Sequence, residues 1–281
     1  MEQNMTALVS LFARAYHQKS KDIKIFDDPL STKLITKKEY EMIRLSMSQG
    51  ISFFNPNFKG SKEEALKWIV DHQLSPSVLL RSAFCKEAIE EMKEKGCKQY
   101  LDFASGYDSF AYYYQNQMHV FEIDKKEVIE DKRQRCKDVD IENIQFLSID
   151  LSQENWINTL LQSDYQEDQL SISSMLGLSY YLTKDEFKKM LKQLSKYLLK
   201  GSRLVFDYPS IQESKEAKIN EMLAKRANES MKAKYSFAEL KEILNQCHLT
   251  IIQHENHQTM TEKPNQAEIL STGSCNCINN P

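Results

Sequence analysis

The stretch Gln99-Tyr-Leu-Asp-Phe-Ala-Ser-Gly-Tyr-Asp-Ser109 decides how this chain folds, because it joins an apolar strand to a turn of small residues. Further along, Met118-His-Val-Phe-Glu-Ile-Asp124 is a second apolar run that also ends in acid. Parallel strands open a crevice at their carboxyl ends, where small residues admit a ligand close to the backbone and acids accept ribose hydroxyls. The two stretches together predict a site for a nucleotide-like ligand.

The acids Glu122 and Asp124 precede a predicted helix at 125–137 and follow the small-residue turn by about 20 residues, the spacing of a ribose-binding acid. The turn carries Ala104 where a first glycine is expected, and the fingerprint G-x-G-x-x-G is missing. Taken alone, either acid is as often a helix cap as a ligand-binding residue. The pair together with the turn favours a ligand site.

Composition bounds the class of protein. The 281 residues are enough for one large α/β domain or two small ones, and 41% hydrophobic residues suffice for a substantial core. A formal net charge of -3, from 37 basic and 40 acidic residues, gives no basic field for nucleic acid or an anionic membrane. No signal-like N-terminus and no apolar run near the roughly 18 residues of a membrane span are present. We expect a cytoplasmic protein.

The six cysteines lack paired C-x-x-C spacing and a nearby histidine cluster, so we expect free thiols. Cys275-x-Cys277 offers two ligands near the chain end, which do not close a tetrahedral site. The sequence therefore predicts no metal.

Beyond Leu80 the chain alternates between helix and strand. Helices are predicted at 80–95, 108–116 and 125–137, and strands at 99–104, 118–124, 144–150, 170–176, 202–208 and, less regularly, 248–254. The last 20 residues read as polar and irregular. Because the strands are apolar rather than two-faced, the pattern predicts a mainly parallel sheet covered by helices on both sides.

Three capping boxes of the form Ser/Thr-x-x-Glu begin further predicted helices. They are Ser61-Lys-Glu-Glu64, Thr183-Lys-Asp-Glu186 and Ser236-Phe-Ala-Glu239. The charged segment 211–234 interrupts the alternation and predicts a helical insertion, either part of a lid or an ordinary surface helix. We divide the chain into an N-terminal helical cap with its lead-in helix, 1–95, and an α/β core, 96–281.

At this point the chain resembles the leucine carboxyl methyltransferase-like group of class I S-adenosylmethionine-dependent methyltransferases, in its bacterial O-methyltransferase branch. The resemblance is spread over nearly the whole chain, in order and at the family's spacing. Its motifs are Thr6-Ala-Leu, Phe26-Asp-Asp-Pro29, Arg81, Phe103-Ala-Ser-Gly-Tyr-Asp-Ser109, Phe121-Glu-Ile-Asp124, Ser148-Ile-Asp-Leu151, Gly177-Leu-Ser-Tyr-Tyr-Leu182 and Gly201-Ser-Arg-Leu-Val-Phe-Asp-Tyr208.

The resemblance implies a Rossmann-like, seven-stranded, mostly parallel sheet with a helical N-terminal cap, and S-adenosyl-L-methionine as the cofactor. Arg81 would pair with the methionyl carboxylate, since a guanidinium matches a carboxylate bidentately. The turn Ala104, Ser105 and Gly106 would pack against the cofactor, and Glu122 or Asp124 would hold the ribose. Asp150 and Leu151 would flank the adenine, with Asp102 and Asp108 as second-tier candidates.

One position departs from the family. Leu176 stands where many relatives carry a glutamate near the methionine moiety, which leaves the partner of the cofactor's ammonium group open.

The methyl acceptor is expected to be a carboxylate or hydroxyl of a small molecule. A carboxylate needs no base, whereas a phenol is helped by one, for which Asp207, Tyr180 or a histidine are the candidates. Tyr107, Tyr180, Tyr208 and Phe54 are the expected aromatic wall of the acceptor pocket. Two alternatives stay open: a non-catalytic cofactor-binding relative or sensor, and an NAD-dependent dehydrogenase, against which the missing glycine fingerprint counts.

Overall fold

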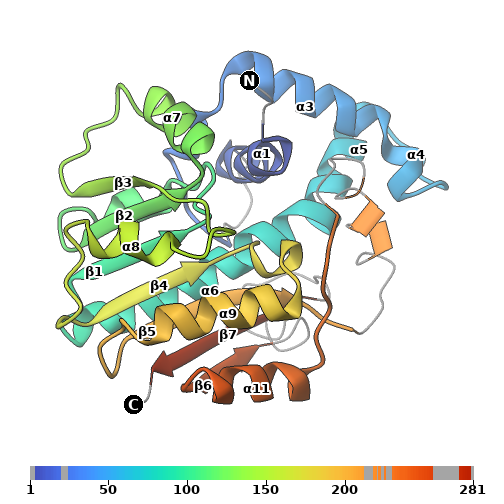
Figure 1. The fold of residues 1–281 in the computed structure, drawn as a ribbon. Helices are drawn as coiled ribbons and strands as arrows, with labels where there is room; N and C mark the ends of the chain where they lie inside the picture. Colours follow the sequence, from blue (N-terminus) through green and yellow to red (C-terminus); the bar gives the residue numbers. More distant parts are fainter. Residues whose placement is uncertain are drawn as a thin grey trace.

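One sheet organises the molecule, and its parallel part has five strands in the order β3-β2-β1-β4-β5 (Figure 1). The computed structural model describes residues 4–19, 25–211, 230–255 and 272–279, with positions 218, 219, 221, 222 and 225 between them. The parallel strands are β1 (Gln99–Phe103), β2 (His119–Asp124), β3 (Ile144–Ser148), β4 (Ser171–Met175) and β5 (Arg203–Pro209). These are the strands that the apolar runs predict.

Beyond β5 the sheet continues through β7 (Thr272–Asn279) to β6 (Leu249–Glu255), and both of these ladders are antiparallel. Strand β7 thus opposes both neighbours, and β6 again runs in the direction of β5. The expectation of an irregular C-terminus is wrong for 272–279. This segment is mostly polar, and its strand character comes from the backbone hydrogen bonds that it receives between two other strands.

Helices cover both faces of the sheet. Strand residues of β1, β2 and β5 pack on one face against α8 (Trp156–Leu161), α9 (Lys184–Ser195) and α11 (Phe237–Gln246). On the other face, α6 (Ser75–Glu94) contacts β4 and β5, and α7 (Lys126–Arg135) contacts β2 and β3. The alternation of strand and helix along the chain produces this arrangement.

The remaining N-terminal elements lie beside the strand ends and against α6 (Figure 1). They are α1 (Met5–Lys19), α2 (Ser31–Leu34), α3 (Lys37–Gln49), α4 (Ile51–Phe54), α5 (Lys62–Ile69) and a π-helical turn, η1 (Val70–Leu74). All three predicted capping boxes are present, at the starts of α5, α9 and α11, and a fourth begins α3 at Thr36.

Two predicted helices differ from the structure. The helix expected at 108–116 is a short 3-10 helix, η2 (Phe110–Tyr114), because the turn after β1 continues to Ser109 and the following residues are aromatic, with modest helix propensity. The helix expected at 80–95 begins earlier, at Ser75, and ends before Gly96, whose φ of 83° suits a glycine there. Much of the predicted insertion at 211–234 lies outside the described residues. Among the residues described, no helix has the length and apolar character needed to cross a membrane.

Candidate functional site

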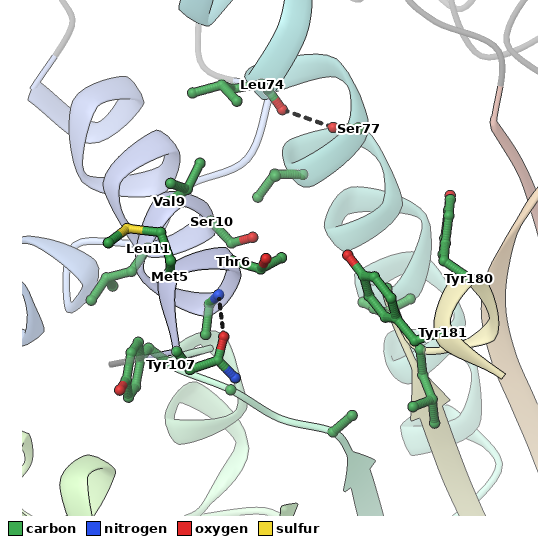
Figure 2. Close-up of a pocket in the computed structure, with 18 of the residues that line it drawn as sticks. Met5, Thr6, Val9, Ser10, Leu11, Leu74, Ser77, Tyr107, Tyr180 and Tyr181 are labelled. Atoms are coloured by element: carbon green, nitrogen blue, oxygen red, sulfur yellow. Dashed lines mark hydrogen bonds between the residues drawn. The ribbon is translucent and has the colours of Figure 1, made fainter. Parts of the chain in front are cut away.

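A cavity of about 1110 Å³ opens at the carboxyl ends of the parallel strands. Its walls come from α1, the start of α6, the turn after β1, the end of β2 and the loop after β4 with its 3-10 helix η3 (Ser179–Tyr181). Figure 2 shows Thr6 and Ser10 of α1 on one side and Tyr180 and Tyr181 on the other, with Ser77 of α6 between them. Ligand pockets commonly span 300–1,000 Å³, so there is room for more than one small molecule.

The small-residue turn after β1 forms one wall. Ala104 and Gly106 both have positive φ, 53° and 51°, so the chain reverses tightly at the strand end. A Cβ on Gly106 would lie 3.3 Å from the Cβ of Ala7, which shows how closely this turn approaches α1. Ala104, Ser105, Gly106 and Asp108 all line the cavity, as the sequence predicts.

The two acids of β2 have different places. Asp124 lines the cavity, where its carboxylate accepts the amide of Gly106 at 2.8 Å and that of Lys125 at 2.7 Å. Glu122 is fully buried beside Lys132 of α7, with which it forms an ion pair, and it is not among the lining residues. Of the two acids expected to hold the ribose, Glu122 or Asp124, the structure thus brings only Asp124 to the cavity. Both residues point to the same face of β2, but Glu122 lies two residues further from the strand end, under α7.

Asp102 lies at the cavity end of β1 with one oxygen bonded and one free. Its Oδ1 accepts the Ser174 hydroxyl at 2.6 Å, while Oδ2 is buried with no hydrogen-bond partner among the described residues. Burial first, and then the charge of Glu122, raise the pKa of Asp102 well above its usual range. A buried oxygen of this kind on a cavity wall is suited to a ligand that brings a donor.

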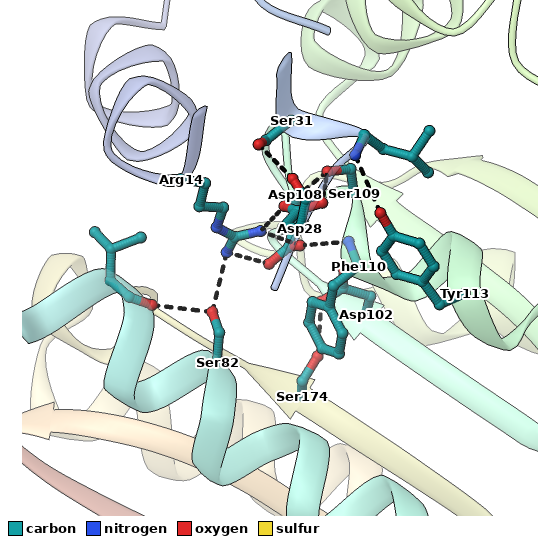
Figure 3. A network of polar contacts seen from close by, with 12 residues as sticks. Arg14, Asp28, Ser31, Ser82, Asp102, Asp108, Ser109, Phe110, Tyr113 and Ser174 are labelled. Carbon is teal, nitrogen blue, oxygen red and sulfur yellow. Dashed lines mark hydrogen bonds and ion pairs between the residues drawn. The ribbon is translucent and has the colours of Figure 1, made fainter. Parts of the chain in front are cut away.

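A buried charged group, the Arg14 cluster (Arg14, Asp28, Ser82, Asp108 and Ser109), joins α1 to the turn after β1 (Figure 3). Arg14 pairs with Asp108, lies 3.7 Å from an oxygen of Asp28 and donates to Ser82 at 3.2 Å. The Ser109 hydroxyl donates to Asp28 at 2.7 Å. The Arg14 guanidinium holds the pKa of Asp108 below its usual value against the opposing effect of burial. Arg14 and Asp108 line the cavity, so the cluster fixes one of its walls.

Arg81 of α6 lines the cavity, as predicted, and its guanidinium pairs with Asp207 of β5 at 3.2 Å. Asp207 also accepts the Tyr180 hydroxyl at 3.0 Å and the Gly177 amide at 2.5 Å. Asp207 is thus bonded by three donors and does not line the cavity, which argues against its prediction as a base. Burial and the Asp207 charge raise the pKa of Tyr180, which favours the protonated phenol and argues against its prediction as a base.

Among the predicted pocket aromatics, Tyr107, Tyr180 and Phe54 line the cavity. Tyr208 does not; it lies in the core, where its hydroxyl contacts His254 Nε2 at 2.8 Å. Tyr208 ends up there because it follows Asp207 on the strand and faces the opposite side of the sheet. Asp150 and Leu151 are also not among the lining residues, and Asp150 bonds to the Ser152 backbone at 3.0 Å.

Sequence reasoning missed Arg14 and Gln73. Arg14 had a signal, because it is a single arginine in a helix whose neighbours Leu11, Phe12 and Ala15 are apolar. Gln73 lies on the π-helical turn η1 and lines the cavity, and its Oε1 is buried with no partner among the described residues. Its position depends on the π-helical turn, which no sequence pattern marked. No group of acids, histidines and cysteines in the described part of the chain is arranged for a metal ion.

The parallel sheet with a cavity at its carboxyl edge defines an α/β methyltransferase fold. The structure of a candidate methyltransferase from Thermobifida fusca YX shares this fold, with a TM-score of 0.63 and 12% identity, covering 100% of this chain and 97% of that one. Magnesium protoporphyrin IX methyltransferase (ChlM) from Synechocystis PCC 6803, solved with bound SAH, has a TM-score of 0.50 and 12% identity, covering 85% of this chain and 99% of that one. At this identity the likeness shows the fold.

Sequence comparison is more specific. The family model of leucine carboxyl methyltransferase matches residues 7–195. YktD of Bacillus subtilis (strain 168), a protein named as a candidate S-adenosyl-L-methionine-dependent methyltransferase, is 30% identical over 269 residues, covering 90% of this chain and 88% of YktD. The chain belongs to the leucine carboxyl methyltransferase family.

Proposed function

We propose that the protein is an S-adenosylmethionine-dependent methyltransferase that methylates an oxygen of a small molecule, with a carboxylate as the preferred acceptor. The family and the relatives make S-adenosyl-L-methionine the cofactor. The observation that carries the proposal is that one cavity is lined both by the Arg81 guanidinium and by Asp102, whose Oδ2 has no hydrogen-bond partner among the described residues. A zwitterionic amino-acid group needs a cation for its carboxylate and an anion for its ammonium.

The residues present fit the rest of the cofactor. Asp124 uses two of its roughly four acceptor positions on backbone amides, which leaves positions for ribose hydroxyls. The turn from Ala104 to Gly106 lines the cavity with small residues, which allow a ligand to approach the backbone closely. Asp102 takes the place of the acid missing at Leu176, since Asp102 pairs in register with Ser174 on the neighbouring strand. Asp150 and Leu151 remain the proposed neighbours of the adenine.

S-adenosylmethionine supplies a methyl group already activated on a sulfonium, so the protein's part is to align and desolvate the acceptor at about 3 Å. Aromatic side chains from three places line the cavity and supply apolar surface for this: Tyr107 after β1, Tyr180 on η3 and Phe54 on α4. Helices α1, α3 and α4 contribute lining residues and would exclude water as a cap.

The titratable groups favour a carboxylate acceptor over a phenol. Among the described residues no histidine lines the cavity, and Asp207 and Tyr180 are each committed to other bonds. A carboxylate is ionised at neutral pH and needs no base.

Calorimetric titration with S-adenosylmethionine, S-adenosylhomocysteine and NAD tests the proposal before the acceptor is known. We expect both sulfur ligands to bind and NAD not to bind. Arg81→Ala should weaken both by about tenfold or more, as expected for loss of a partly buried charged contact. Arg133→Ala on α7, which is outside the cavity, is the matched control and should leave both affinities unchanged.

Three results separate the alternatives. Binding of NAD alone would support the dehydrogenase and contradict the proposal. Binding of the sulfur ligands without methyl transfer, in a screen of small carboxylic acids and phenols, would favour the non-catalytic sensor. Transfer to phenols alone would retain the methyltransferase and overturn the carboxylate preference.

A further inference from the structure

We infer that Asp207 is a positioning residue: with Tyr180 and Gly177 it fixes the Arg81 guanidinium in the orientation that receives the cofactor's carboxylate. This inference rests on the proposed function, in which Arg81 makes that contact. Asp207 itself lies behind the cavity wall, whereas Arg81, Gly177 and Tyr180 are part of the wall.

These three partners take up three of the roughly four acceptor positions of the Asp207 carboxylate. Oδ1 accepts the Gly177 amide at 2.5 Å, and Oδ2 accepts both Arg81 Nη1 at 3.2 Å and the Tyr180 hydroxyl at 3.0 Å. The strand is held as well, because the Ser179 hydroxyl donates to the Asp207 carbonyl at 2.6 Å. With a side chain only 1% exposed, Asp207 has no route to the ligand and acts through its neighbours.

Gly177 supplies the second constraint on the guanidinium. Its φ is 76°, a left-handed conformation that favours glycine, and a Cβ there would lie 2.9 Å from Arg81 Nη1 and 3.1 Å from Nη2. The Arg81 guanidinium therefore packs directly against the Cα of Gly177, in the space that a Cβ would occupy. Any side chain at 177 would push it from this place.

The contacts with Asp207 and Gly177 hold the long, flexible Arg81 side chain in one conformation. Fixing an arginine side chain in one conformation costs rotamer entropy, and a buried anchor meets that cost before the ligand arrives. The anchor joins three elements that are far apart in the sequence: α6, the loop after β4, and β5. Leu176, the residue before Gly177, has no charge that competes for the guanidinium.

The test compares two ligands that differ at the carboxylate end. S-adenosylhomocysteine has the amino-acid group, and 5′-methylthioadenosine lacks it but keeps the adenosine and the sulfur. We expect Asp207→Asn to weaken S-adenosylhomocysteine by about tenfold and 5′-methylthioadenosine by less than about twofold. Tyr180→Phe should follow the same pattern more weakly. Glu91→Gln is the matched control, because Glu91 pairs with Arg203 at the other end of β5, at 2.6 Å.

A double-mutant cycle shows whether Asp207 acts through Arg81. Asp207→Asn should cause no further loss on an Arg81→Ala background, because the guanidinium it positions is gone. Additive losses would overturn the inference, and so would equal losses on both ligands in Asp207→Asn. Unchanged affinity of Asp207→Asn for S-adenosylhomocysteine would also overturn it.

A second variant and the behaviour of the wild type separate failure of the positioning role from failure of the proposed function. If Asp207→Asn does not fold, Gly177→Ala displaces the guanidinium from the other side, and it should reproduce the selective loss on S-adenosylhomocysteine. A wild-type protein that is folded but binds neither ligand overturns the proposed function itself. A wild type that binds, with a Gly177→Ala variant of unchanged selectivity, overturns only the positioning role.

Discussion

At the scale of single residues, position along a strand decides which acid faces the cavity. Glu122 and Asp124 are equally good candidates in the sequence, and the cavity lies where the sequence predicts a ligand site, at the ends of β1 and β2. Lys132, eight residues beyond Asp124, reaches back to Glu122 and buries it. No spacing rule shows that contact in advance, because it depends on how α7 packs on the sheet.

Replacing Asp102 by asparagine should make the protein more stable at high pH but weaken its binding of the cofactor. Burial raises its folded-state pKa above the unfolded value of about 3.9, so the folded protein retains a proton that the unfolded chain releases. Stability contributed by this proton is present below about pH 4 and is lost as pH rises through the raised pKa. Asp102→Asn keeps an oxygen for Ser174 and removes the titration.

We therefore expect Asp102→Asn to melt higher than the wild type at pH 8, by about 2–4 °C for each kcal/mol gained, with the difference shrinking towards pH 4. The same variant should bind S-adenosylhomocysteine about tenfold more weakly, because an asparagine, unlike Asp102, cannot release a proton to become the anion that the ligand's ammonium group needs. Thermal melts between pH 4 and 8 and calorimetry at pH 7.5 measure the two effects. A melting difference that does not change with pH would contradict the titration, and unchanged affinity would contradict the contact.

At the scale of elements, strands were easier to predict than the segments between them. The five parallel strands have apolar residues on both faces, because helices cover the sheet on both sides. This makes each strand a continuous apolar run that can be recognised in the sequence. The helix expected at 108–116 is the shorter 3-10 helix η2, and the strand β7 is not predicted. Both owe their form to neighbours: Asp108 accepts the Phe110 amide at 3.0 Å at the start of η2, and β7 lies between β5 and β6.

The buried pair Lys132 and Glu122 attaches α7 to β2, and both side chains are completely inaccessible to solvent. Removing one partner leaves an uncompensated charge, which typically costs about 3–5 kcal/mol. We expect Lys132→Met to lower the free energy of unfolding by about that amount in urea denaturation. Adding Glu122→Gln should recover most of the loss, because the double variant buries no charge. A single variant that costs less than about 1 kcal/mol would contradict this account.

At the scale of the whole molecule, the N-terminal helices are tied to the sheet by charged contacts at two places. The first is the Arg14 cluster, beside the cavity. The second is Arg135 of α7, which donates to Glu39 of α3 at 2.7 and 2.9 Å and to the Leu34 carbonyl at 3.0 Å. Its guanidinium also lies 4.4 Å from the ring centre of Tyr107, a residue of the cavity wall. Arg135 thus connects α3 to Tyr107, so the position of α3 affects the shape of the cavity wall.

Glu39→Gln tests the contact between Arg135 and Glu39 while leaving the start of α3 largely intact. A glutamine at this position still serves the capping box with Thr36, so the main loss is the charged contact with Arg135. We expect the free energy of unfolding at pH 7 to fall by about 1–2 kcal/mol, as for hydrogen bonds to a charged group. Glu64→Gln is the matched control, since Glu64 has the same capping position on α5 and bonds to Ser61; its effect should be smaller.

The pH dependence distinguishes a charged contact from a loss of packing. Hydrogen bonds from Arg135 lower the pKa of Glu39 to about 2, below the value of 4.5 for a free glutamate. A depressed folded-state pKa contributes stability that is present above pH 4.5 and is lost as pH falls towards 2. Urea denaturation of wild type and Glu39→Gln at pH 7, 5, 4 and 3 should therefore show curves that converge on acidification. A difference that stays constant over this range would mean that Glu39 holds α3 by shape rather than by charge, and that the link from α3 through Arg135 to Tyr107 does not depend on an ion pair.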